Sequence, residues 1–276
     1  MNLQVLLNPE CYYSCLCHTL TTEEEEVVGL LLGSSIENEN YNIVTIKLNK
    51  PLKRTDKKKD RTEVNPQQLS NCLDYAENLT KKTNKEYRIV GWYHSHPKHI
   101  NVFPSEMDLK TQMQYQQMDP NFVGLIFSTF NQESTNNQGN IRVTCFQAGT
   151  SKDGYSKYED FAHKKIPLYI NPQLQTPLQP VSFEPISNLS GVIFDEQRTS
   201  YLQFLNNSKI SNSNKIHTSD LIYYSGIYQK KLAMLIETLN YPILQNLQDR
   251  LEYTKELVEK KKIELRKLKN QNKSEY

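Results

Sequence analysis

The sequence has little net charge and no long apolar segment. Its 33 Lys and Arg nearly balance its 31 Asp and Glu, which gives a formal net charge of +2 over 276 residues. Proteins that bind nucleic acid normally present a clearly basic face, so this balance argues against that class. No apolar run approaches the roughly 18 to 20 residues that cross a bilayer, and the first residues do not resemble a secretory signal peptide. We therefore expect an intracellular protein, long enough for one ordinary domain and an appendage.

Cysteine is scarce and irregularly spaced. The five cysteines are an odd number, and inside a cell they should be reduced rather than paired. Cys11, Cys15, Cys17 and His18 lie close together, but no second Cys or His pair follows at zinc-finger distance. We therefore predict the buried face of a helix there, not a second metal site. A His-Glu-x-x-His motif is also missing, as is a convincing Cys/His framework for a cysteine protease.

Candidate metal ligands are concentrated in residues 91–112. The preceding run, Tyr87–Tyr93, is rich in β-branched and aromatic residues and predicts a strand. His94 and His96 at its end are two residues apart, so both imidazoles should point to one face. A His-x-His pair by itself is more often structural, and only further ligands nearby would favour a metal site.

Ser105 follows His96 after an eight-residue connection, and the carboxylate of Asp108 comes three residues later. Pro104 disfavours helix in the residue before it and Ser105 is a good N-cap, so a helix should begin here with Ser105 and Asp108 on one face. Ser-x-x-Asp alone usually marks a capping box. Together, however, His94, His96 and Asp108 form a three-ligand set that suits Zn²⁺ with water in the fourth position, as in catalytic zinc sites.

These motifs resemble the JAMM signature of the MPN-domain metalloproteases, which cleave isopeptide bonds to ubiquitin and its relatives. The resemblance rests on His94-Ser95-His96-Pro97, on Ser105-x-x-Asp108, and on an upstream Glu26-x-x-Gly29. It is closest to the K63-specific deubiquitinase subunit of the BRISC and related DNA-damage complexes. The segments that carry this closer likeness are 52–61, 90–97, 122–128 and 144–147, and it continues more weakly into the C-terminal helices.

The resemblance implies an α/β fold and a set of residue roles. An MPN domain, with a mixed β-sheet flanked by helices, should occupy residues 1–180, and a helical region with a C-terminal coiled coil should occupy 181–276. One Zn²⁺ with a bound water is implied at His94, His96 and Asp108. Glu26 would move the proton and Ser105 would stabilise the oxyanion. Among four consecutive glutamates, only the family pattern selects Glu26.

The chain departs from the family pattern in one loop. The family has seven residues between the second His and the Ser, whereas here there are eight. We expect the extra residue to enter around Lys98, where a loop insertion costs little stability, and the zinc site to survive.

The resemblance also implies partners. These are K63-linked polyubiquitin, an inactive MPN-domain subunit of the Abraxas type and further scaffold subunits, in the cytoplasm and the nucleus, with a role in DNA repair. Direct binding of nucleic acid or membrane is not expected. The basic segment Leu52–Arg61 is by composition a solvated loop, but in the subgroup it helps to handle the ubiquitin chain. The ubiquitin tail would add as a strand near residues 52–64.

Periodicity and turn residues predict the remaining elements. Helix 9–20 should bury Cys11, Cys15, Leu16 and Leu20, and helix 66–82 should bury Leu69, Leu73, Ala76 and Leu79. The other predictions are strands at 27–33, 42–48, 122–130, 141–147 and 166–170, a short extended run at 62–64, a helix at 105–118, a loop at 131–140, a polar stretch at 149–165, a linker at 172–185, and helices from 195 that break at 206–214 and at Pro242.

The last helix carries an interrupted apolar stripe at a and d spacing. Its members are Leu244, Leu247, Leu251, Thr254, Val258, Lys261, Leu265 and Leu268. So narrow a stripe on a charged helix favours coiled-coil pairing, although packing on its own domain stays open.

Two other functions remain open beside a K63-specific deubiquitinase. One is a JAMM isopeptidase for another ubiquitin-like modifier or linkage, and the other is an MPN scaffold without catalysis. The intact ligand set, together with Glu26 and Ser105, argues against the scaffold.

Overall fold

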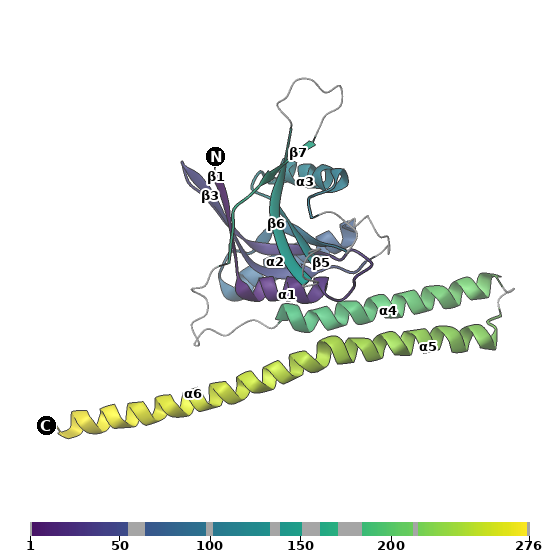
Figure 1. Cartoon of the computed structure of the whole chain (residues 1–276). Coiled ribbons are helices and arrows are strands. Elements are labelled where there is room, and N and C mark those ends of the chain that lie inside the picture. Colours follow the sequence, from purple (N-terminus) through teal and green to yellow (C-terminus); the bar gives the residue numbers. More distant parts are fainter. Residues whose placement is uncertain are drawn as a thin grey trace. The chain divides into compact units, whose positions relative to one another are not determined.

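The computed structural model describes residues 2–54, 64–97, 102–132, 139–150, 161–170, 184–211 and 215–274 (Figure 1). Two compact units divide the chain, Met1–Val192 and Ile193–Tyr276. The domain boundary that we predicted, between residues 180 and 181, lies outside the described residues and stays a prediction.

The first unit is built on one mixed eight-stranded sheet with the order β7-β6-β5-β4-β2-β3-β1-β8. The strands are β1 (Asn2–Leu7), β2 (Val28–Glu37), β3 (Tyr41–Pro51), β4 (Arg88–His96), β5 (Val123–Gln132), β6 (Gly139–Thr150), β7 (Phe161–Lys165) and β8 (Leu168–Ile170). The pairs β1–β3, β1–β8 and β4–β5 are parallel and the others are antiparallel. β4 therefore lies between β2 and β5, in the interior of the sheet.

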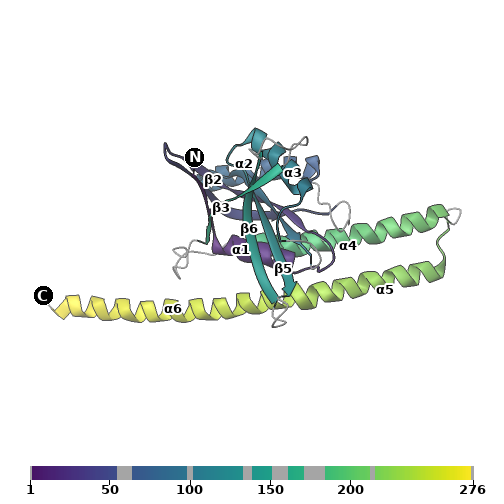
Figure 2. The same ribbon diagram turned by 45° about the horizontal axis from the view of Figure 1, so that its top comes forward.

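Helices cover both faces of this sheet (Figures 1 and 2). On one face, α1 (Pro9–Thr19) contributes Cys11 and Cys15 to a core that also contains Tyr93. On the other face, α2 (Pro66–Thr83) and α3 (Glu106–Met118) contribute Cys72 and Leu109 to a second core with Trp92. Neighbouring residues of β4 thus serve opposite cores, as the alternation of a strand requires. The predicted α/β class, a mixed sheet flanked by helices and followed by helices, is confirmed.

Two predicted core residues of the helices are wrong. Leu20 follows the last turn of α1 and is exposed, and Leu73 on α2 is exposed as well. Small side chains are almost completely buried on these helices, Cys15 on α1 and Cys72 on α2. The predicted buried cysteine face of α1 is confirmed for Cys11 and Cys15.

Three strand predictions need correction. Residues 131, 132, 139 and 140 belong to β5 and β6 rather than to a loop, since Asn131 pairs with Asn140 across the hairpin. The stretch 149–165, expected to be only polar, contains β7, an edge strand with exposed His163, Lys164 and Lys165; charged side chains are usual on edges and hide the strand pattern. The strand predicted at 166–170 is shorter: Ile166 is buried and Pro167 precedes β8.

Several predictions fall outside the described residues. They concern most of the basic segment 52–61, residues 62 and 63 of the extended run, the loop around Lys98, residues 133–138, and residues 172–183 of the linker.

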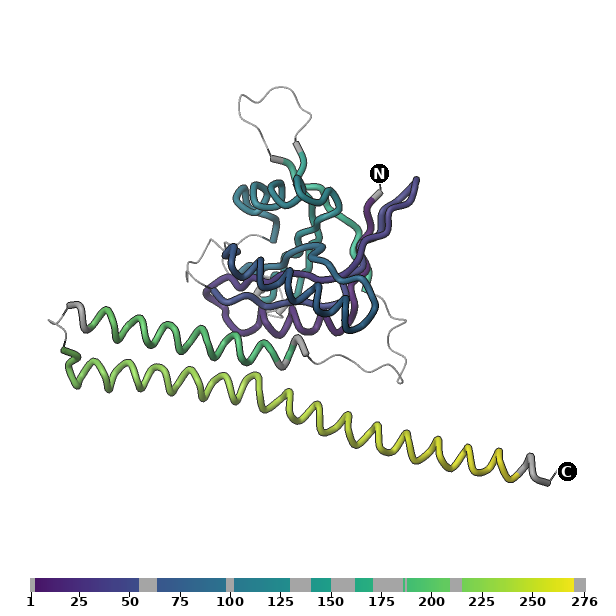
Figure 3. The backbone as a smooth tube through the Cα atoms, turned by 180° about the vertical axis from the view of Figure 1, so that it is seen from behind, coloured from purple at the N-terminus to yellow at the C-terminus, as the bar shows by residue number. Residues whose placement is uncertain are grey.

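The second unit consists of long helices (Figure 3). They are α4 (Glu184–Ser211), which begins in the first unit, then α5 (Thr218–Leu235) and α6 (Tyr241–Ser274). Stacked rings join α4 to α5, Tyr201 on Tyr228 at 4.9 Å and Phe204 on Tyr224 at 5.0 Å between centroids. In the part of the chain that the structure describes, no helix is long and apolar enough to span a membrane.

The break predicted at 206–214 begins later than expected, because α4 continues through residues 206–211 and α5 begins at Thr218. The break predicted at Pro242 is wrong, because Pro242 lies inside α6. Instead a π-helical turn, Ile236–Asn240, links α5 to α6 directly before Tyr241 and Pro242.

The apolar stripe of α6 is exposed in this chain. Leu244, Leu251, Val258, Leu265 and Leu268 are each about half accessible to solvent or more, and Leu247 is half-buried. Its pairing as a coiled coil stays a prediction.

Candidate metal centre

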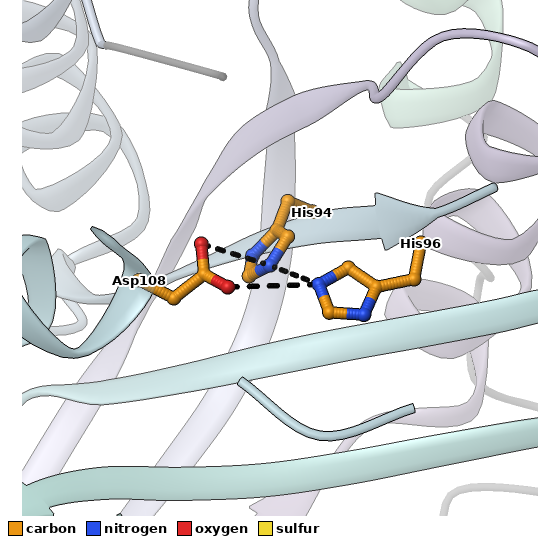
Figure 4. A group of neighbouring side chains, drawn as sticks. All are labelled: His94, His96 and Asp108. Carbon is orange, nitrogen blue, oxygen red and sulfur yellow. Dashed lines mark hydrogen bonds and ion pairs between the residues drawn. The ribbon is translucent and has the colours of Figure 1, made fainter. Parts of the chain in front are cut away.

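The side chains of His94, His96 and Asp108 converge on one point (Figure 4). Both histidines lie at the end of β4 and are almost fully buried, while Asp108 comes from the first turn of α3. The two imidazole Nε2 atoms are 3.1 Å apart. Nε2 of His94 is 3.4 Å from Oδ1 of Asp108, and Nε2 of His96 is 3.6 Å from Oδ2.

These distances fit a tetrahedral ion. Ligands at roughly 2.0 to 2.2 Å from zinc, placed at the corners of a tetrahedron, are separated by about 3.3 to 3.6 Å. The two separations between an imidazole and the carboxylate, 3.4 and 3.6 Å, lie within that range, and the separation of 3.1 Å between the two imidazoles is about 0.2 Å below it. Two imidazoles and one carboxylate also form a borderline-hard donor set of the kind zinc prefers. Among the described residues, this is the one group of three or more His, Cys, Asp or Glu side chains able to hold a metal ion.

The charges of the site are strongly coupled. Burial lowers the pKa of His94, but Asp108 and, more weakly, Glu26 outweigh it and leave that pKa above its ordinary value. Burial raises the pKa of Asp108, yet the facing His94, with hydrogen bonds from His96 and Ser105, holds it well below its usual range. The carboxylate is therefore ionised at neutral pH and ready to act as a ligand.

Stacking on Trp92 fixes the ring of His94. The Trp92 and His94 rings lie 4.6 Å apart and nearly parallel. The indole N–H of Trp92 donates to Oε1 of Gln112 at 2.8 Å, and Nε2 of Gln112 donates to the carbonyl of Phe122 at 2.8 Å. Metal-binding histidines usually have a hydrogen bond on the other ring nitrogen, but no described residue bonds Nδ1 of His94. The Trp92–Gln112 pair supplies the orientation instead.

Ser105 and Asp108 form a capping box. Ser105 is the N-cap of α3 as predicted, and its hydroxyl accepts from the Asp108 N–H at 3.2 Å. That hydroxyl also donates to Oδ2 of Asp108 at 2.7 Å, and the backbone N–H of Ser105 donates to the same oxygen at 2.7 Å. Here the backbone and the hydroxyl of Ser105 together orient the Asp108 carboxylate.

Glu26 lies beside the same centre. Val28 pairs with His94, and the backbone N–H of Ser95 donates to the Val27 carbonyl, so Glu26 continues this alignment opposite His96. Paired residues of antiparallel strands point to the same face, which places Glu26 on the side of the two histidines. Glu26 is only 7% exposed, and its charge contributes to the raised pKa of His94.

Gly29 of the Glu26-x-x-Gly29 pattern allows a close approach of two strands. It pairs with Tyr93, and a Cβ at this position would collide with the Tyr93 ring. The Tyr93 hydroxyl then reaches Nδ1 of His18 at 2.8 Å and Nδ2 of Asn49 at 3.3 Å. Gly29 of this pattern therefore makes room for the Tyr93 ring, which packs on the face of the sheet opposite the histidines.

The sequence reasoning missed the residues that support the site. Ser95, Trp92 and Gln112 were not singled out, although Ser95 and Trp92 lie inside the motif. A polar residue between the two histidines was the one available signal for Ser95. Gln112 gives no local signal, because its role depends on the packing of α3 against β4.

Comparisons with known proteins agree with this geometry. The model of the JAB1/Mov34/MPN/PAD-1 ubiquitin protease family matches residues 1–121, and that of the BRCC36 C-terminal helical domain matches residues 182–272. The Lys-63-specific deubiquitinase BRCC36 of Xenopus tropicalis is 35% identical over 248 residues, which cover 90% of this chain and 89% of the frog protein. The protein of that name from Mus musculus is 34% identical over 269 residues (90% and 88%), and that from Homo sapiens 32% over 290 residues (90% and 89%).

Proposed function

We propose, given that this chain belongs to the JAB1/Mov34/MPN/PAD-1 family of ubiquitin proteases, that it is a zinc isopeptidase which cleaves K63-linked polyubiquitin. The observation that carries this proposal is the convergence of His94, His96 and Asp108 beside the buried Glu26. The K63 preference is supported by the likeness to the Lys-63-specific deubiquitinases, which extends over most of the chain.

His94, His96 and Asp108 are the residues that would hold zinc. When bound there, zinc would supply a water of lowered pKa and a Lewis acid for the isopeptide carbonyl. The chain's contribution is to keep the Asp108 carboxylate ionised and to hold the His94 ring in place, through β4 and the stacked Trp92.

Glu26 is the proposed proton carrier. It would accept a proton from the attacking water and return it to the departing lysine amine. Its burial limits the approach of bulk water, and its position opposite His96 puts the carboxylate on the side of the reacting atoms.

Ser105 is the proposed donor to the developing oxyanion. Its hydroxyl now donates to Asp108, and a rotation about its side-chain bond would exchange that acceptor for the substrate oxygen. The backbone N–H of Ser105 would keep Asp108 in place during that exchange, because it makes its own bond to Oδ2.

The partners that we propose are ubiquitin chains and a helical subunit. The exposed stripe of α6 needs a second apolar surface to leave water. The match to the BRCC36 C-terminal helical domain supports a partner of the kind that binds such helices, an inactive MPN-domain subunit of the Abraxas type with further scaffold subunits. Action in DNA repair, in cytoplasm and nucleus, is part of the same proposal.

Zinc analysis combined with cleavage of di-ubiquitins of every linkage tests this function. It should be run on the chain alone and on material purified with its native partners. We expect about one zinc per chain and cleavage of the K63 linkage. Cleavage of another linkage or modifier would replace the substrate, and zinc-free, inactive material would favour the non-catalytic scaffold.

A further inference from the structure

Glu26 lies outside the regular hydrogen-bond ladder of the sheet. β2 begins at Val28, and residues 23–25 form a bend after α1. Since a misplacement of 1 Å at a reacting group can lower a rate by about 10²-fold, the contacts that fix this segment matter for the chemistry.

The first contact lies on the C-terminal side of Glu26. The N–H of Val27 donates to Oγ of Ser95 at 2.9 Å, and the N–H of Ser95 donates to the Val27 carbonyl at 3.0 Å. Both residues are almost completely buried. Because Ser95 stands between His94 and His96, its side chain ties the backbone next to Glu26 directly to the strand that carries two of the ligands.

The second contact lies on the N-terminal side. Nη1 of Arg54 is 2.7 Å from Oε2 of Glu25, and the Arg54 side chain is only 7% exposed. An exposed pair such as Lys81 with Glu77, at 3.8 Å, contributes little because water screens it, whereas burial of the Arg54 guanidinium reduces the screening of its pair with Glu25. Glu25 is therefore held in one place, one residue before Glu26.

Arg54 is itself held by α2 and β2. The side-chain amide of Gln68 on α2 accepts from the N–H of Lys53 and donates to its carbonyl, each at 2.8 Å. The N–H of Leu52 donates to the carbonyl of Val28 at 3.0 Å. The two residues that precede Arg54 are thus each held by a hydrogen bond, one to β2 and the other to α2.

We infer that Arg54 and Ser95 are positioning residues for Glu26, Arg54 acting through Glu25 and Ser95 through Val27. Two of the four consecutive glutamates then have different tasks: Glu25 anchors the segment and Glu26 carries the proton. The inference rests on the proposed function, because it assigns these residues to the placement of its proton carrier.

A double-mutant cycle on the complex purified with its native partners tests the inference. The variants are Arg54→Met, Glu25→Gln and the two combined, with Ser95→Ala beside Ser95→Thr. Lys81→Met, which removes the exposed pair on α2, is the control. Each is assayed for cleavage of K63-linked di-ubiquitin well below its unfolding temperature, together with its zinc content.

We expect kcat to fall about 10- to 100-fold in Arg54→Met, Glu25→Gln and Ser95→Ala, with KM and zinc content unchanged. The combined variant should be no slower than the worse single one, Ser95→Thr should recover most of the activity because it keeps the hydroxyl, and Lys81→Met should match the unaltered chain. If Arg54→Met does not fold, the partly exposed Glu25→Gln gives the same test.

Losses that multiply in the combined variant, changes confined to KM, or loss of zinc would overturn the inference. Glu26→Gln separates it from the proposed function. If Glu26→Gln is slow while Arg54→Met, Glu25→Gln and Ser95→Ala are fast, the positioning role is wrong and the proton carrier stands. If Glu26→Gln is as fast as the unaltered chain, the proton carrier is wrong and the positioning role falls with it.

Discussion

Replacing Gln112 by Leu tests whether the orientation of His94 depends on the Trp92–Gln112 pair. Gln112 is completely buried and makes two hydrogen bonds of 2.8 Å, one from the Trp92 indole and one to the Phe122 carbonyl. Leu fills a similar volume but leaves the indole N–H without an acceptor. The Phe122 carbonyl keeps a bond of 3.0 Å from Gln147.

The expected loss of stability follows from the one buried donor, the Trp92 indole N–H, that Gln112→Leu leaves without an acceptor. One orphaned buried donor lowers the free energy of unfolding by about 1 to 3 kcal/mol. If the indole then shifts under the His94 ring, zinc affinity should fall about 10- to 100-fold, the usual effect of losing support for a metal ligand. Denaturant unfolding measures the first quantity and competition with a chelator of known affinity measures the second.

Gln116→Leu is a matched control on the same helix. Gln116 also makes two hydrogen bonds, both to backbone: it donates to the Ala148 carbonyl at 3.0 Å and accepts from the Ala148 N–H at 2.8 Å. Neither bond involves the indole that stacks on His94. Both variants should be less stable, and only Gln112→Leu should bind zinc more weakly. Equal zinc affinity in the two variants and the unaltered chain would refute the reasoning.

Four further outcomes are expected. Glu26→Gln should keep zinc and lose about 10²- to 10⁴-fold in kcat, and undiminished cleavage would remove Glu26 from the mechanism. Asp108→Ala should lose zinc and activity together, because two ligands hold zinc poorly; a zinc-loaded variant would contradict this ligand assignment. Replacing Leu247 and Leu251 by Glu should detach the helical partner and lower activity while zinc stays, and full activity of a monomer by light scattering would show that no partner is needed. Burial, helped by the charge of Arg54, lowers the pKa of His18 to about 3 from 6.5. Only the unfolded chain then takes up this proton below pH 6.5, so stability should fall as pH drops from about 6.5 towards 3, less so in His18→Gln; identical denaturant midpoints against pH would exclude this role.

Local pattern could predict the ligands because their spacing follows the periods of a strand and of a helix start. His94 and His96 are two apart on β4, and Ser105 and Asp108 are three apart at the first turn of α3. The extra residue between the two motifs does not prevent the convergence of the side chains, as expected for an insertion in a loop.

The contacts that support the ligands could not be predicted in the same way. Which glutamate faces the histidines depends on the pairing of Val28 with His94, and the partner of Glu25 is far along the chain at Arg54. Such pairings are tertiary, so neither propensity nor periodicity contains them. Tertiary packing also explains why Leu73 is exposed and why strand β7 is polar. The position of a helix or an edge strand on the sheet decides which of its sides is buried.

The π-helical turn Ile236–Asn240 changes the angular phase of everything that follows it. One added residue in a helix rotates later side chains by about 100° around the axis. The leucines of α6 are therefore rotated about the helix axis, relative to Tyr224 and Tyr228 of α5, from the position that an uninterrupted α-helix would give them. Deleting one residue of this turn would rotate the whole stripe of α6 without altering its sequence, and would redirect any helix that binds there.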